Sequence, residues 1–161
     1  MPGLRAIPDT CSEGLQRGRV TVAMTLKLSC VNNVAKQVLD ELVEGLDVGD
    51  SKKFDRGIGY MPVHVECLQK SALGLHFSIA HYYEQNGDMV PDPDCVIVRR
   101  ADGSWAPISF QNSISYRNAV TFHDDGTIEV DEREQKEPSR FVNHWMKNVS
   151  DQQAIPTRRG R

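Results

Sequence analysis

The clearest pattern in the first part of the chain is a set of apolar residues that recur at three- and four-residue steps between Ser29 and Gly45. This spacing is typical of an amphipathic helix. Ser29 is a plausible N-cap, and Gly45 or Gly49 is a plausible stop. The apolar face carries Val31, Val34, Val38, Leu39, Leu42 and Val43. The opposite face, which we interpret as solvated, carries Asp40, Glu41 and Glu44.

From residue 60 onward, apolar and polar residues alternate with the period of two that is expected of β-strands. Leu75, Phe77 and Ile79, for example, alternate with His76 and Ser78. The preceding polar stretch, with its lysines and glycines, is interpreted as a linker loop at residues 50–59. We predict five strands and one further short run, at residues 60–68, 73–84, 94–100, 105–110, 115–123 and 127–130.

A polar turn separates the second and third of these strands. Asn86, Gly87 and Asp88 tolerate positive φ or bond their own backbone, so the chain can reverse there. Pro91 and Pro93 then remove two backbone donors, and we expect that run to form a loop or the start of an edge strand. The two strands should therefore form a wide hairpin.

A second helix is predicted from about Pro138 to Val149, because proline suits the first turn of a helix. Its apolar stripe would consist of Phe141, Val142, Trp145 and Val149. The expected fold class is α+β, with an antiparallel β-meander of about five strands covered on one face by an N-terminal and a C-terminal helix.

Length and composition bound the organisation of the chain. With 161 residues it is near the usual size of one domain. We expect a flexible segment at residues 1–23, a single α+β domain at 24–150 and a flexible basic tail at 151–161. Met24 opens the better-formed part and is a candidate start of the protein.

Hydrophobic content of 39% with 25% charged residues is that of a soluble globular protein. No apolar run approaches the roughly 20 residues that a membrane-spanning helix needs, and the first 23 residues lack the apolar centre of a secretory signal. The cysteines have no Cys-x-x-Cys spacing, so neither a disulfide framework nor a zinc ribbon is expected. We therefore expect a cytoplasmic protein with no membrane contact. The cysteines are Cys11, Cys30, Cys67 and Cys95.

The net charge of −3 is distributed unevenly. Residues 60–150 hold eight basic and thirteen acidic side chains. An acidic body does not attract a phosphate backbone, so nucleic-acid binding by the folded part is not expected. Arg158, Arg159 and Arg161 could touch an anionic partner, although a solvated terminus is the simpler interpretation.

Candidate catalytic chemistry is weak. His81, Asp88 and Asp92 could converge as a metal site or a general base, which would make a metal-dependent hydrolase. However, His81 shares a strand face with apolar residues, where a hydrogen-bonded core histidine is the simpler interpretation. No nucleophile elbow or phosphate-binding loop is present in the sequence. We accordingly expect no catalytic residue, no metal and no cofactor.

A partner-binding surface is the better candidate for function. Tyr82 and Tyr83 are neighbours on a predicted strand, so one of them must reach the uncovered face of the sheet, where tyrosine often anchors an interface. The adjacent turn residues could contribute to this surface or could simply form the turn; they are Gln85, Asn86, Asp88 and Asp92.

The segment from Asp124 to Glu137 holds seven acids against Arg133 and Lys136. An acidic surface of this kind can occupy the basic nucleic-acid channel of a nuclease, although a solvated loop before a helix would look the same. The candidate contact residues in this segment are Asp124, Asp125, Glu129, Asp131 and Glu132.

Several motifs, in a fixed order, carry a family resemblance. They are Gly59-Tyr60-Met61, the run from Ile79 to Asp88, Asp92-Pro93, the run from Gly103 to Pro107 and the closing run from Phe141 to Asn148. Together they resemble domain of unknown function 6908, a bacterial family found on plasmids, integrative elements and phages. One departure is the segment 109–113, which lacks the acid that often ends a glutamine-rich turn at this place in the family.

These observations favour a small, non-enzymatic binding or accessory protein of mobile-element type, whose partner is a protein. A narrower alternative is an inhibitor of a host defence system, either anti-restriction or anti-CRISPR, suggested by the mobile-element association and the acidic segment. The third alternative, from a different class, is the metal-dependent hydrolase built on His81, Asp88 and Asp92.

Overall fold

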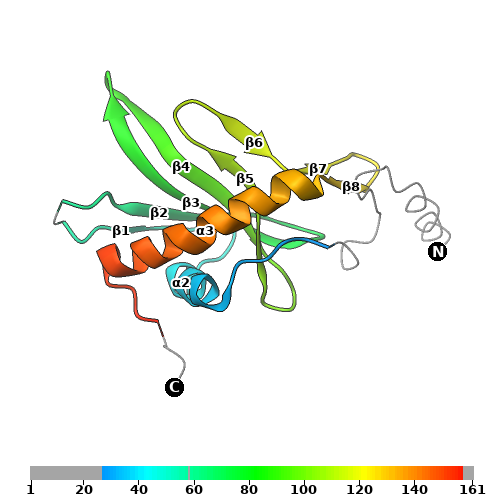
Figure 1. The fold of residues 1–161 in the computed structure, drawn as a ribbon, viewed down its shortest axis with the longest axis horizontal. Coiled ribbons are helices and arrows are strands. Elements are labelled where there is room, and N and C mark those ends of the chain that lie inside the picture. Colours follow the sequence, from blue (N-terminus) through cyan, green and yellow to red (C-terminus); the bar gives the residue numbers. More distant parts are fainter. Residues whose placement is uncertain (1–26, 58, 158–161) are drawn as a thin grey trace.

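A computed structural model describes residues 27–57 and 59–157 of the chain, which form a curved antiparallel sheet packed against two helices (Figure 1). The helices are α2 (Asn33–Val43) and α3 (Glu132–Gln153). The strands are β1 (Ser51–Phe54), β2 (Val63–Ser71), β3 (Gly74–Gln85), β4 (Asp88–Arg99), β5 (Trp105–Gln111), β6 (Tyr116–Asn118), β7 (Val120–Phe122) and β8 (Ile128–Val130). The α+β class with an antiparallel meander is confirmed.

Strands β1 to β6 form one sheet in chain order, and each strand pairs antiparallel with the next. Strand β1 was not expected, because its residues fall within the predicted linker. Its burial pattern is half-exposed throughout, so the sequence has no apolar alternation that would reveal it. Pairing with β2, from Ser51 opposite Glu66 to Phe54 opposite Val63, holds this polar segment in the sheet.

The predicted wide hairpin is wrong, because β3 and β4 are joined by a two-residue turn. Asn86 and Gly87 both have positive φ, 52° and 86°, and Gln85 pairs directly with Asp88. Positive φ at both central residues is the requirement of a type I′ turn, which matches the twist of the flanking strands. Pro91 and Pro93 therefore lie within β4, in its edge half, which is the second of the two predicted alternatives.

The prolines are tolerated because this half of β4 has a neighbour on one side only. Pairing between β4 and β5 begins at Asp94 opposite Gln111, whereas residues 88–91 pair with β3 alone. A proline on such an edge removes no ladder hydrogen bond. The tip of the β3–β4 hairpin, which we call the arm (residues 82–93), projects beyond the rest of the sheet in Figure 1.

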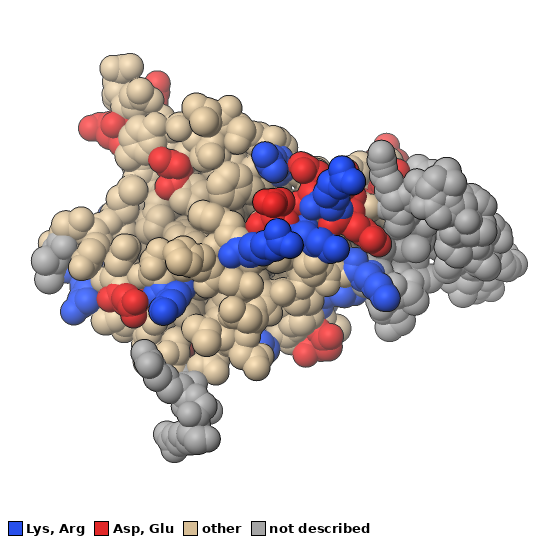
Figure 2. Space-filling view, viewed as in Figure 1, with Lys and Arg blue, Asp and Glu red and all other residues tan. Residues whose placement is uncertain are grey.

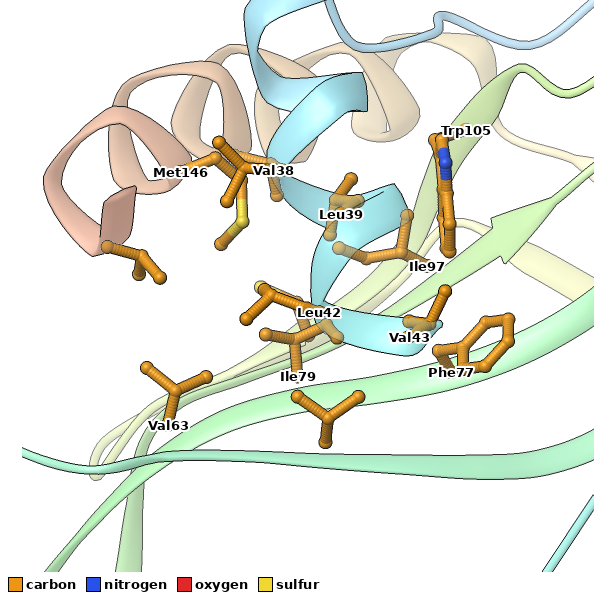
Figure 3. Close-up of a cluster of buried hydrophobic side chains, with 14 of the residues drawn as sticks. Val38, Leu39, Leu42, Val43, Val63, Phe77, Ile79, Ile97, Trp105 and Met146 are labelled. Carbon is orange, nitrogen blue, oxygen red and sulfur yellow. The ribbon is translucent and has the colours of Figure 1, made fainter. Parts of the chain in front are cut away.

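One face of the sheet is covered by both helices, as predicted. Val38, Leu39 and Leu42 of α2 point toward the strands, where they meet side chains such as Phe77 and Ile79 (Figure 3). These side chains are essentially inaccessible to solvent. Burial of this apolar surface is the dominant stabilising term of the fold.

The predicted fifth strand is in fact two strands. Val120 and the residues after it leave the main sheet and pair with β8 as a separate two-stranded sheet. A second apolar cluster lies there, and the ring of Phe122 packs near that of His76 on the opposite side of the sheet from the helices. Its buried members are Leu73, Val98, Ile108, Ala119, Val120, Ile128 and Val130.

Helix α2 begins later than predicted. Asn32, and not Ser29, is the N-cap, and its side chain accepts a hydrogen bond from the amide of Ala35 at 2.9 Å. Ser29 instead contacts the other helix: the hydroxyl of Ser139 donates to its carbonyl oxygen at 2.7 Å, and Gln135 bonds its backbone. Gly45, at φ 80°, follows the C-cap and confirms the predicted stop.

Helix α3 is longer than predicted at both ends. Asp131 is its N-cap and accepts hydrogen bonds from the amides of Arg133 and Glu134. Pro138 therefore lies inside the helix and not in its first turn. The helix also continues to Gln153, and Ile155 is buried. The folded part therefore extends beyond residue 150, where the predicted tail was expected to begin.

The predicted flexible segment at 1–23 and the candidate start at Met24 lie outside the described residues. Within the described part of the chain, no helix is both long and apolar enough to cross a membrane.

Candidate functional site

The first group of predicted partner residues lies on the arm. Tyr82 reaches the sheet face opposite the helices, where its ring contacts the ring of His64 edge-on at 5.2 Å between centroids. Gln85, Asn86 and Asp88 are exposed at the tip, together with Met89. Tyr83 and Asp92 are half-buried. The expectation that one tyrosine occupies the uncovered face is met by Tyr82.

The second group lies at the other end of the molecule. Asp124 and Asp125 occupy the turn between β7 and β8, which is at the opposite end from the arm in Figure 1. The predicted residues therefore do not form one surface. The sequence could not reveal this separation, because it depends on the departure of β7 from the main sheet.

Much of the acidic segment has structural partners. Asp131 caps α3, Asp125 accepts hydrogen bonds from the amide and hydroxyl of Thr127, and Glu129 lies 3.3 Å from Nε2 of His123. Figure 2 shows acidic and basic side chains intermixed near the start of α3. Glu134, for instance, pairs with Arg117 at 3.7 Å. The segment is thus a mixed-charge surface.

His81, Asp88 and Asp92 do not converge. His81 is buried, donates from Nδ1 to the carbonyl oxygen of Pro62 at 2.9 Å and packs its ring against Trp145. Asp88 is exposed at the tip of the arm, and the carboxylate of neither aspartate accepts a hydrogen bond within the described part of the chain. The described residues contain no group of three His, Cys, Asp or Glu side chains able to hold a metal ion.

The uncovered face of the sheet carries a shallow polar hollow of about 310 Å³ over β1, β2 and β3. Its position follows from the register, because residues directly opposite one another on paired strands share a face. Lys53 lies opposite His64, and Glu66 lies opposite Ser78. The lining residues are Ser51, Lys52, Lys53, His64, Val65, Glu66, Ser78 and Tyr82.

Asp94 lies beside this hollow and is partly shielded from water. Burial raises the pKa of its carboxyl group, and a hydrogen bond of 2.8 Å from the hydroxyl of Ser78 offsets part of that shift. Burial also raises the pKa of Tyr82, with smaller contributions from Asp94 and Glu66. The hollow is therefore lined by hydrogen-bonding groups, and one of them, Ser78, bonds a neighbouring carboxyl whose pKa is raised.

A second recess lies at the other edge of the sheet, between β6 and α3. Its volume is about 240 Å³, and the rings of Phe110 and Phe141 form its apolar wall at 5.1 Å between centroids. We call this recess the aromatic groove; its lining residues are Phe110, Asn112, Ser115, Arg117, Glu137, Pro138 and Phe141. Ile114 and Tyr116, at 88% and 63% exposure, are the most exposed large apolar side chains of the described residues.

The free edges of the main sheet differ in how they are protected. Natural proteins block edge strands with lysine, proline or charge, because an open edge can pair with another chain. Strand β1 carries Lys52 and Lys53, and the free half of β4 carries Pro91 and Pro93. Strand β6 is protected only by its short length, because its one charged residue, Arg117, is already paired with a glutamate of α3.

The aromatic groove was missed from sequence. Phe141 was assigned to the core stripe of the last helix, yet it is 37% exposed and lines the groove. One signal was available: Ile114 is a large apolar residue in an otherwise polar turn, where burial cannot account for it. The hollow was missed because it depends on the register of three strands.

The comparison with known protein families gives a match. A family described as a domain of unknown function (DUF6908) matches residues 33–155. The match confirms the resemblance seen in the motifs and extends it to α2 and β1. No curated protein and no solved structure matches the chain.

Proposed function

The chain belongs to the DUF6908 family, and from this membership we propose that it is a small, non-enzymatic accessory protein of a bacterial mobile element that binds a protein partner. The observation that carries the proposal is the exposure of Ile114 and Tyr116 at the β5–β6 turn and the start of β6, next in sequence to Ser115 and Arg117, which line the aromatic groove. Exposed apolar side chains scattered singly need no explanation, whereas a cluster rimmed by polar groups is typical of an interaction site.

The composition of this surface supports a protein as partner. Aromatic residues and arginine are enriched at protein interfaces, and both kinds line the groove as Phe110, Phe141 and Arg117. Tyr116 is exposed next to Arg117, with its side chain on the opposite face of β6. The arm offers a second surface for the same purpose, since Met89 is 60% exposed next to its tip. The contribution of each surface to partner binding can be tested separately, because each can be altered by its own substitutions.

A narrower form of the proposal makes the partner a component of a host defence system. The mixed charges around α3 do not favour mimicry of a nucleic acid, so this form would also depend on contact through the aromatic groove. Plaque and transformation assays against a panel of restriction and CRISPR systems test it. Equal plaque and transformation efficiencies with and without the protein across the panel would rule out a defence system as the partner. They would not count against protein binding itself.

The direct test is capture from bacterial lysates with the tagged full-length chain, followed by mass spectrometry. We compare the unaltered chain with Ile114→Ser and with Val48→Ser, a matched change at a residue that is 54% exposed in the loop between α2 and β1. The expected result is a stoichiometric protein that Val48→Ser retains and Ile114→Ser loses.

Two outcomes would count against the proposal. One is that no stoichiometric protein is recovered from hosts with and without the mobile element. The other is that Ile114→Ser and Val48→Ser capture the same proteins as the unaltered chain, which would remove the β5–β6 surface as the contact. A parallel Met89→Ser variant then shows whether the arm carries the interaction.

A further inference from the structure

We propose that the partner contributes an extended segment that pairs with β6 as a seventh strand of the main sheet and places an apolar side chain in the aromatic groove. This inference rests on the proposed protein-binding function and specifies how the partner is held. In this mode of recognition, main-chain hydrogen bonds supply affinity, and pockets for alternate side chains supply specificity.

The main-chain groups needed for pairing point away from the sheet. The amide of Ala119 donates inward to the carbonyl oxygen of Ile108 at 2.9 Å, and the carbonyl oxygen of Ser115 faces inward, where it accepts from the amide of Asn112 at 2.9 Å. The direction of these groups alternates along an antiparallel strand. The N–H and C=O groups of Tyr116 and Asn118 therefore face outward, on a strand with β5 as its one neighbour in the main sheet.

The aromatic groove lies on a face of the sheet to which every second side chain of the added strand would point. Phe110 and Arg117 are direct cross-strand partners, so their side chains share the helix-covered face. A residue of the added strand opposite Arg117 would share that face as well. From there an unbranched or aromatic side chain can extend toward Phe141 and Pro138. We therefore expect an apolar residue at this one register position.

A second copy of the same chain is a poorer occupant than a segment of another protein. The symmetric register that uses the outward groups of Tyr116 and Asn118 in both copies places Arg117 directly opposite Arg117 of the other copy. Like charges directly opposite each other destabilise a strand pair. A foreign segment has no such restriction, because its residue at that position can be apolar.

The test uses a phage-displayed library of random linear peptides, selected on the immobilised full-length protein. Peptides with one recurrent apolar position should be enriched. Tyr116→Pro removes an outward N–H without breaking a bond to β5, as Pro91 and Pro93 already do on β4. We expect it to weaken binding of the best peptide by about tenfold or more, whereas Tyr116→Ala should retain more of the affinity.

The peptide itself gives a second measurement that does not depend on the folding of a variant. Methylation of single backbone nitrogens along the best peptide should abolish binding at alternate positions only, because every second N–H of an added strand faces β6. Loss without alternation, or equal binding to Tyr116→Pro and Tyr116→Ala, would overturn strand addition.

The same variants separate this inference from the proposed function. A lysate protein that is captured equally by Tyr116→Pro and the unaltered chain would overturn strand addition and leave protein binding standing. Failure of the unaltered chain to capture any protein would instead count against protein binding itself. A shift to a dimer at rising concentration, abolished by Tyr116→Pro, would overturn the choice of a foreign segment.

Discussion

The indole nitrogen of Trp105 donates a hydrogen bond of 2.9 Å to Oδ1 of Asp40, and this bond joins the start of β5 to α2. Trp105 is fully buried. The other carboxylate oxygen of Asp40 pairs with Lys36 at 2.7 Å. Asp40 is 39% exposed and Glu41 and Glu44 are exposed, so the solvated face is confirmed, but Asp40 also joins the helix to the sheet, which the sequence did not indicate.

Asp40→Ala should lower the free energy of unfolding by about 1–3 kcal/mol, because it leaves a buried indole N–H without an acceptor. Asp40→Asn keeps an acceptor oxygen and should cost less. Glu41→Ala, at an exposed neighbour on the same helix, is the control and should stay within about 0.5 kcal/mol of the unaltered protein. Urea unfolding measures all three, and equal costs for Asp40→Ala and Glu41→Ala would contradict the assignment.

Gly74 should tolerate substitution far less well than Gly126, although both have positive φ. A Cβ on Gly74 would lie 2.1 Å from the carbonyl oxygen of Arg99, so the β3 and β4 backbones would have to move apart. A Cβ on Gly126 would meet no heavy atom within 4 Å. We expect Gly126→Ala to cost about 1 kcal/mol and Gly74→Ala at least twice that. Similar unfolding midpoints for the two variants would disprove the close approach.

The tip of the arm should depend on Gly87 and not on Asp88. Gly87→Val places a β-branched residue at φ 86°, which should cost about 1–2 kcal/mol and loosen the arm. Asp88→Ala should have little effect, because the carboxylate accepts no hydrogen bond from the described residues, contrary to our expectation that it bonds the turn. Amide hydrogen exchange in residues 82–93 reports this, and faster exchange in Asp88→Ala would restore the earlier expectation.

Stability should fall as the pH drops below about 6.5, the ordinary pKa of histidine. Burial lowers the pKa of His76, whose Nε2 lies 2.7 Å from the hydroxyl of Ser71. The unfolded chain then takes up a proton at a higher pH than the folded chain does. The stability from this group is thus complete above about 6.5 and decreases as the pH falls toward the folded value.

His76→Gln should flatten the dependence of the free energy of unfolding on pH between neutral and mildly acidic conditions. Part of the slope should remain, because the pKa of His64 is also lowered, chiefly by burial and next by Lys53. Urea unfolding at a series of pH values measures the slope. An unchanged slope in His76→Gln would show that His76 does not contribute.

Local periodicity was enough to predict the elements that pack on the core. Val38, Leu39 and Leu42 recur at helical spacing, and Phe77 and Ile79 alternate along a strand, so both patterns locate buried faces correctly. The type I′ turn was not predicted as such, because the two prolines after it suggested a loop or the start of an edge strand and so a wide hairpin. Their tolerance depends on β5 ending beside Asp94, which is a property of the sheet and not of the local sequence.

The candidate site was less predictable than the fold. Strand alternation was enough to place either Tyr82 or Tyr83 on the uncovered face, but not to say which. The aromatic groove could not be predicted in this way, because it joins residues 110 and 141, which are distant in sequence. Similarly, the acidic run is continuous in sequence, but helix capping and ion pairs give its members separate roles in the structure. The position of such surfaces depends on how the strands and helices pack in three dimensions, which local sequence patterns do not specify.

The most direct test of the account is amide hydrogen exchange at Tyr116 and Asn118, followed by NMR on the full-length protein with and without the best selected peptide. Strand addition predicts that both amides exchange readily in the free protein and become strongly protected in the complex, while the amide of Met89 on the arm is unchanged. Protection at the arm, with Tyr116 and Asn118 exchanging as in the free protein, would contradict it.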